Sequence, residues 1–224
     1  MISTPIAAVL FDLDGTLIDT APEFVAVVHR MRAELGKPPL PDEAIRRSVS
    51  NGSAGLVTSA LDCPPDHADY ERLRNRFLDL YEERLGTDSA PYPGLRELTD
   101  TLAQRGLPWG VATNKFRRFA EPLMNLMAFS APPQCLVTPC DVKLPKPDPE
   151  SIILACKQLG TPPEQVLYVG DHIRDIEAGR GAGCLTAAAA YGYIEVGDDP
   201  HSWDADIVVN SGVDLHNALL ELLV

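Results

Sequence analysis

The sequence predicts an α/β protein in which helices cover both faces of a parallel β-sheet. Short apolar runs recur along the 224-residue chain, and helical patterns lie between most of them. Buried strands that alternate with helices imply βα units and a sheet that is covered on both sides. The runs expected to form strands are 7–11, 109–113, 135–138, 166–169, 185–189 and 206–209.

The first expected helix has a recognisable beginning and end. It starts after Thr20, where Thr-Ala-Pro-Glu has the spacing of a capping box and places a proline early in the first turn. Apolar residues then recur at helical spacing as far as Leu35. Gly36 stands where a glycine would end the helix.

The alternation of strands and helices lapses between about residues 21 and 84. This stretch contains helical patterns and polar breaks but no convincing strand, and the turn Pro91-Tyr92-Pro93-Gly94 marks the return to alternation. We therefore expect two domains. Residues 1–18 and 88–224 would form the α/β core, and residues 19–87 would form an inserted helical cap.

The composition is ordinary for a globular protein, with 45% hydrophobic and 23% charged residues. The formal net charge of −13 argues against a surface for nucleic acid or for an anionic membrane, because either would need a broad basic patch. An anionic substrate is compatible with this charge, since a few local cations and a metal reverse the field inside one cleft.

The five cysteines indicate neither a disulfide framework nor a zinc site, because their number is odd and no Cys-x-x-Cys pair occurs. A reducing cytoplasm is the expected location. The first apolar run lacks a cationic flank and stops at Asp12, so we expect no signal peptide. No apolar stretch approaches the length of a transmembrane helix, and the sequence indicates no protein partner.

Polar residues follow four of the expected strands. Because ligands of open α/β sheets bind beyond the carboxyl ends of the strands, we expect these residues to meet at one edge of the sheet. They are Asp12 and Asp14 after the first strand, Thr113 and Asn114 at the second, Lys146 past the third, and Asp171 and Asp175 past the fourth.

Asp12 and Asp14 suit phosphoryl transfer. A carboxylate can attack phosphorus when Mg²⁺ offsets the repulsion from the phosphate and an acid protonates the leaving oxygen. Two residues apart, the side chains project to the same side of an extended segment, and Gly15 lets the backbone turn beside the phosphate. Taken alone, Asp-Leu-Asp-Gly fits an Asp-rich turn equally well.

The other strand ends could complete such a site. Asp171 and Asp175 would share one face of a helical turn and offer the carboxylate oxygens that Mg²⁺ prefers, although acids at a solvated helix start are the alternative interpretation. Thr113 and Asn114 would donate hydrogen bonds to phosphate oxygens. Lys146, between two prolines, would supply a positive charge, with Lys143 as the alternative.

Four segments resemble, in order, the four motifs of the haloacid dehalogenase-like hydrolase superfamily. They are Asp-Leu-Asp-Gly-Thr (12–16), Thr-Asn (113–114), Lys-Pro-Asp-Pro (146–149) and Gly-Asp-His-Ile-Arg-Asp (170–175). The resemblance spans nearly the whole chain. It implies a Rossmann-like core, and a helical cap that follows the first motif.

The same resemblance implies a role for each matching residue. Asp12 would be the nucleophile and a metal ligand. Asp14 would be the general acid and base, and its backbone carbonyl would also bind the metal. Thr113 and Lys146 would bind phosphate. Asp171 would bind Mg²⁺, and Asp175 would support it directly or through water.

A finer resemblance concerns the substrate, a small phosphorylated metabolite. Residues 109–115, 153–159 and 188–194 look like the phosphoglycolate phosphatase branch, and within it like bacterial N-acetylmuramic acid 6-phosphate phosphatases. Residues 46–53 resemble the loop that sets substrate specificity in related caps, so Ser50 and Asn51 are expected substrate contacts.

Three other functions are known for, or compatible with, the same fold. Dehalogenases need no acid to protonate a leaving group, so the presence of Asp14 argues against them. A phosphomutase uses the same two aspartates and a similar cap, and stays open. A non-catalytic phosphate-binding protein with the same fold would be expected to have lost a site residue, and none is missing.

Overall fold

The centre of the computed structural model, which describes residues 5–222, is a six-stranded parallel sheet. The order of its strands is β5-β4-β1-β6-β7-β8. All six expected strands are present, which confirms the predicted α/β class. The strands are β1 (Ala8–Phe11), β4 (Trp109–Ala112), β5 (Cys135–Val137), β6 (Val166–Gly170), β7 (Leu185–Ala189) and β8 (Ile207–Val209).

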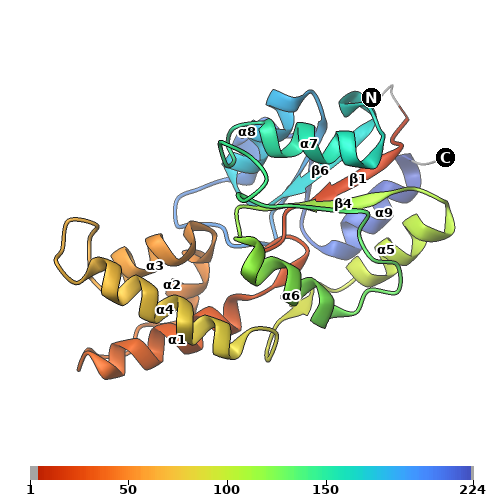
Figure 1. The fold of residues 1–224 in the computed structure, drawn as a ribbon. Helices are drawn as coiled ribbons and strands as arrows, with labels where there is room; N and C mark the ends of the chain where they lie inside the picture. Colours follow the sequence, from red (N-terminus) through yellow and green to blue (C-terminus); the bar gives the residue numbers. More distant parts are fainter. Residues whose placement is uncertain (1–4, 223–224) are drawn as a thin grey trace.

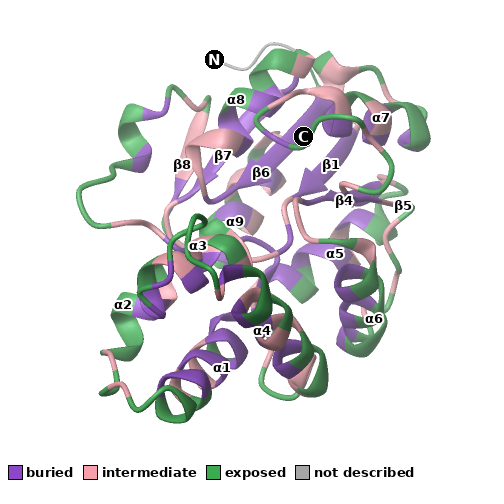
Figure 2. Ribbon diagram, turned by 60° about the vertical axis from the view of Figure 1, so that its left-hand side comes forward, coloured by how far each residue is buried: buried purple, intermediate pink, exposed green. Residues whose placement is uncertain are grey.

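Helices cover both faces of the sheet, and the strands between them are largely buried (Figures 1 and 2). Helices α5 (Leu95–Gln104), α6 (Arg117–Met127) and α9 (Gly212–Leu222) lie on one face, and α7 (Glu150–Leu159) and α8 (Ile173–Ala182) lie on the other. Alternate residues of a strand therefore enter different cores: Val9 and Phe11 pack on the first face, Ala8 and Leu10 on the second. This explains why the strands read as continuous apolar runs.

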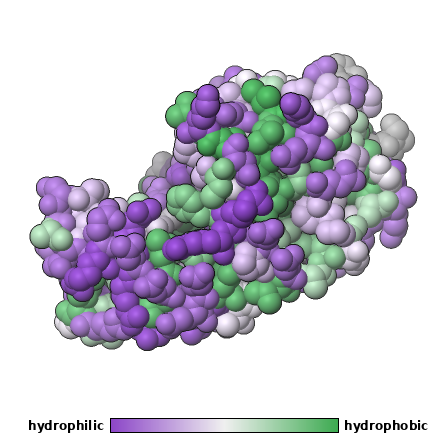
Figure 3. Space-filling model, viewed as in Figure 1, coloured by the Kyte–Doolittle hydropathy of each residue, from purple (hydrophilic) through white to green (hydrophobic). Residues whose placement is uncertain are grey.

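Four helices occupy the stretch where the alternation lapses. They are α1 (Ala21–Glu34), α2 (Asp42–Arg47), α3 (Gly52–Ala60) and α4 (Tyr70–Arg84), and no strand lies between residues 21 and 84. These helices have an apolar cluster of their own, in which the rings of Phe24 and Tyr81 stack with centroids 4.3 Å apart. They extend from the sheet at the lower left of Figure 1, and their outer surface is mainly hydrophilic in Figure 3.

Two short strands that the sequence did not predict connect the helices to the sheet. β2 (Ile18–Asp19) precedes α1, β3 (Ala90–Pro91) follows α4, and the two pair antiparallel. Strands of two residues are too short to carry an alternating pattern. In the part of the chain that the structure describes, no helix has the length and apolar character needed to cross a membrane.

The first turn of α1 differs from expectation. The helix begins after Thr20 as predicted, but the capping box is wrong, because Thr20 makes no side-chain cap. Its hydroxyl instead donates to Asp14 at 2.6 Å, and the Glu23 carboxylate accepts from the Ser89 N–H at 3.0 Å and hydroxyl at 2.7 Å. Tertiary partners thus replace the local hydrogen bonds.

Strands β4 and β5 leave no room for a side chain at Gly110. Gly110 of β4 lies opposite Cys135 of β5, and a Cβ at Gly110 would collide with the Cys135 thiol and lie 3.1 Å from Leu10. We expect Gly110→Ala to lower the free energy of unfolding by about 1–3 kcal/mol, measured by urea denaturation. In a Cys135→Ala background the same substitution should cost less. An equal cost in both backgrounds would contradict the steric explanation.

Candidate active site

The predicted site residues converge at the carboxyl ends of β1, β4 and β6. The chain runs from β1 to β4 and β5 on one side and then crosses to β6 on the other, so the strand order reverses at β1. Ligands of such sheets bind at this switch point. A cavity of about 330 Å³ lies there, lined by residues of the core and of α3 and α4.

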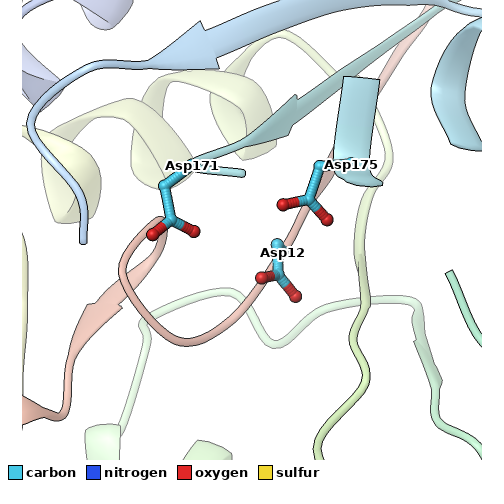
Figure 4. Close-up of side chains that lie close together, drawn as sticks. All are labelled: Asp12, Asp171 and Asp175. Atoms are coloured by element: carbon cyan, nitrogen blue, oxygen red, sulfur yellow. The ribbon is translucent and has the colours of Figure 1, made fainter. Parts of the chain in front are cut away.

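Three carboxylates meet beside this cavity. The side chains of Asp12, Asp171 and Asp175 point toward one another (Figure 4), and each has an oxygen within 4.8 Å of the others. Asp171 and Asp175 are buried. Burial, with the nearby charges of Asp12 and Asp175, raises the pKa of Asp171 to about 7. Burial also raises the pKa of Asp175. The three acids therefore concentrate negative charge where water screens it poorly.

The atoms of this cluster fit a hard divalent cation. All three candidate ligands are oxygens, which Mg²⁺ prefers over nitrogen and sulfur. Asp12 Oδ1 is buried, and it lies 2.7 Å from the Lys146 ammonium. The Asp14 side chain is outside the cluster, and the expected contribution of its backbone carbonyl stays a prediction.

Lys146 supplies positive charge to the cluster. Its buried ammonium lies 2.7 Å from Asp12 Oδ1 and 2.6 Å from Asp175 Oδ1, and it donates to the Tyr168 hydroxyl at 2.8 Å. Burial alone lowers the pKa of Lys146, but the charges of Asp12 and Asp175 outweigh burial and raise it. The ammonium therefore stays protonated at neutral pH.

Asn114 holds Lys146 in place. Its side-chain amide donates to the Lys146 carbonyl and accepts from the Lys146 N–H, both at 3.0 Å. These bonds indicate a positioning role, and the phosphate contact expected from the sequence stays a prediction. Thr113 lines the cavity, and its hydroxyl accepts from the Lys115 N–H at 3.2 Å.

The expected specificity loop reaches the carboxylate cluster. The Ser50 hydroxyl donates to Asp171 Oδ2 at 3.1 Å. The Arg174 guanidinium of α8 donates to the Ser50 carbonyl at 3.0 Å and to Asn51 Oδ1 at 3.2 Å, and the Asn51 amide donates to Glu195. Both predicted loop residues line the cavity, and the core holds the loop beside the site.

Two further side chains bind site residues but received no role from the sequence. Lys115 Nζ donates to the Asp14 carboxylate at 2.9 and 3.2 Å and to the Tyr81 hydroxyl at 2.7 Å. The Thr16 hydroxyl donates to Asp171 at 3.0 Å. Lys115 directly follows the motif residue Asn114, and Thr16 is the last residue of the first motif, which was the available signal. Tyr81 comes from α4, and no local pattern pointed to it.

Comparisons with known proteins agree with this geometry. Residues 6–183 match the family model of the haloacid dehalogenase-like hydrolases. The chain is 47% identical to the N-acetylmuramic acid 6-phosphate phosphatase of Pseudomonas aeruginosa, over 95% of this chain and 94% of the relative. It is 38% identical to a phosphoglycolate phosphatase of Xanthomonas campestris pv. campestris, over 90% of this chain and 91% of the relative.

A solved structure supports the fold independently. The crystal structure of a predicted phosphoglycolate phosphatase from Haemophilus somnus matches with a TM-score of 0.85, covering 96% of this chain and 99% of that one. At 23% identity this match shows a shared fold. The resemblances to the superfamily and to the two phosphatase groups are thus confirmed: the chain belongs to the haloacid dehalogenase-like hydrolase family.

Proposed function

We propose that this hydrolase is a Mg²⁺-dependent phosphatase that acts on N-acetylmuramic acid 6-phosphate through an aspartyl-phosphate intermediate. The observation that carries the proposal is the cluster of Asp12, Asp171 and Asp175 beside the Lys146 ammonium, which combines a nucleophile, metal ligands and a fixed cation. The choice of substrate rests on the relative that is 47% identical and is named for that activity.

In the first step, an Asp12 carboxylate oxygen attacks phosphorus and the bond from phosphorus to the leaving oxygen breaks. Asp14 gives its proton to that oxygen, so the alcohol leaves neutral. In the second step, water attacks the phosphoryl group, Asp14 takes a proton from the water, and inorganic phosphate leaves with Asp12 restored. Lys115 and Thr20 both donate to Asp14 Oδ1, at 2.9 and 2.6 Å, and so fix the orientation of the carboxyl group.

Mg²⁺, held by Asp12, Asp171 and the Asp14 carbonyl, with support from Asp175, would neutralise charge on the transferring phosphoryl group. Lys146 and Thr113 would bind the phosphoryl oxygens, with Asn114 keeping Lys146 in position. Thr16 and the Tyr193 N–H orient the Asp171 carboxylate, at 3.0 and 2.9 Å. These fixed charges and dipoles need no rearrangement as charge develops in the transition state.

Residues 19–87 would act as the cap that closes over the leaving group. Ser50 and Asn51 line the cavity and contact the core, so they are placed to bind substrate and to exclude water from Asp12.

The cysteines of the described chain are free thiols, which supports a reducing cytoplasm as the location. The binding partner that we infer is the substrate, a small phosphorylated metabolite.

Asp12→Asn tests the nucleophile. The amide keeps the shape but loses the charge needed for attack, so we expect phosphate release to fall at least about 10³-fold with an unchanged melting temperature. Asp66→Asn, at an exposed position in the loop between α3 and α4, is the matched control and should keep full activity. Normal turnover by well-folded Asp12→Asn protein would exclude the aspartyl-phosphate mechanism.

Metal binding should be visible in stability as well as in activity. The raised pKa of Asp171 means that the folded state binds a proton more tightly than the unfolded state between pH 3.8 and about 7. In the metal-free protein the contribution of Asp171 to stability is therefore greatest below pH 3.8 and is lost as the pH rises toward 7.

Mg²⁺ competes with that proton, so we expect it to raise the melting temperature more at about pH 8 than at about pH 5. The gain should approach roughly 3 kcal/mol when Mg²⁺ exceeds its dissociation constant about 100-fold. EDTA should abolish phosphate release. In Asp171→Asn the effect of Mg²⁺ on melting should vanish. A gain that did not depend on pH, or that survived in the variant, would place the metal elsewhere.

The substrate proposal is tested by comparing kcat/KM for N-acetylmuramic acid 6-phosphate and phosphoglycolate. The cavity of about 330 Å³ has room for a sugar, so we expect the sugar phosphate to be preferred at least about 10-fold. Asn51→Ala should reduce this preference. A preference for phosphoglycolate would exclude the sugar phosphate. A requirement for a bisphosphate activator would favour a phosphomutase.

A further inference from the structure

Arg74 stands out among the residues of the inserted helices. Of the residues from 19–87 that line the cavity, all of which the structure describes, Arg74 is the only charged one. It lies on α4 at the same face as Leu78 and Tyr81, which follow it by one and two turns and also line the cavity. The rest of this wall is apolar or carries hydroxyl and amide groups.

The Arg74 guanidinium is weakly engaged within the protein. Its Nε is buried and has no hydrogen-bond partner among residues 5–222. Its ion pair with Glu71 spans 4.0 Å, and the Glu71 side chain is 73% exposed, so water largely screens that pair. A buried donor without an acceptor is unfavourable, and a ligand that supplied the acceptor would remove the penalty.

The other cations that line the cavity are Lys146, Lys115 and Arg174, and each has close partners. The Arg174 guanidinium donates to the Ser50 carbonyl at 3.0 Å and to Asn51 Oδ1 at 3.2 Å. Lys146 pairs with Asp12 and Asp175, at 2.7 and 2.6 Å, and Lys115 pairs with Asp14 at 2.9 Å. These two lysines face the phosphoryl site on the core. Arg74 instead belongs to the inserted helices, on the side where the leaving group must lie.

We propose that Arg74 binds a carboxylate on the leaving group, so that the enzyme selects phosphomonoesters that carry this second anionic group. A guanidinium binds a carboxylate through two parallel hydrogen bonds, and the Nε of Arg74 is one of the donors of that fork. Leu78 and Tyr81 would pack against the apolar part of the substrate. This assignment rests on the proposed phosphatase function and adds a residue that determines specificity.

The kinetic test uses two substrates, one of which lacks the lactyl group that carries the carboxylate. N-acetylglucosamine 6-phosphate is N-acetylmuramic acid 6-phosphate without the lactyl group. We expect Arg74→Gln to lower kcat/KM for the muramic acid ester roughly 10- to 100-fold and for the glucosamine ester less than about threefold. Arg74→Lys should keep part of the discrimination, because it keeps the charge but loses the fork.

Arg72→Gln is the matched control. Arg72 lies on the same helix, its side chain is exposed, and it pairs with Asp69 at 2.9 Å away from the cavity lining. This variant should match the parent on both substrates. Equal losses on both substrates in Arg74→Gln, or no loss on either, would overturn the assignment. Circular dichroism and the melting temperature show whether Arg74→Gln folds normally. If it does not, the assignment is tested by Arg74→Lys, which should discriminate less between the two esters than the parent does.

A binding measurement separates the two proposals. Calorimetry with N-acetylmuramic acid, which lacks phosphate, should detect binding to the parent that weakens at least about 10-fold in Arg74→Gln. N-acetylglucosamine should bind both proteins equally weakly. If the parent hydrolyses neither ester, the proposed function is wrong, but the calorimetry still tests whether Arg74 binds the carboxylate. Equal binding of the two sugars to the parent would overturn the carboxylate subsite.

Discussion

The whole site depends on a buried ammonium that holds carboxylates together. Lys146 lies within 2.7 Å of both Asp12 and Asp175, yet one positive charge cannot balance three acids. Burial, with the charges of Asp12 and Asp175, raises the pKa of Asp171 to about 7. The network is therefore stable only where its members are held rigidly. Asn114 fixes the Lys146 backbone through two hydrogen bonds, and Thr16 fixes Asp171. Removing Lys146 would leave the acids as buried charges with no cation between them.

The same network of hydrogen bonds connects the carboxylate cluster to the inserted segment. Ser50 donates to Asp171, and Arg174, one residue before Asp175, donates to the Ser50 carbonyl. A second link runs through Lys115, which binds Asp14 of the core and Tyr81 of α4. The groups that enclose the cavity thus contact the groups that would perform the reaction. The position of the inserted helices and the alignment of the acids are consequently linked through direct hydrogen bonds.

The order of the strands explains why such distant residues meet. β1 pairs with β4 on one side and with β6 on the other, so the loops after these three strands leave the same edge of the sheet together. Asp12 and Asp171 follow the paired strands β1 and β6. Gly15 and Gly192 keep the space beside Asp171 free, because a Cβ at either position would collide with its carboxylate. Backbone packing therefore sets the geometry of the cluster.

The sequence by itself determined the strands, the helical insertion and the four motifs, because each depends on neighbours within a few residues. Continuous apolar runs mark strands buried on both faces, and acids at strand ends mark a ligand edge. Only the tertiary structure decided which partners the polar side chains take. The Thr20 hydroxyl binds Asp14 and does not cap α1, and the Asn114 amide binds Lys146. Arg74 lines the cavity without a strong partner. These outcomes depend on segments far apart in the chain, whose relative positions no local pattern encodes.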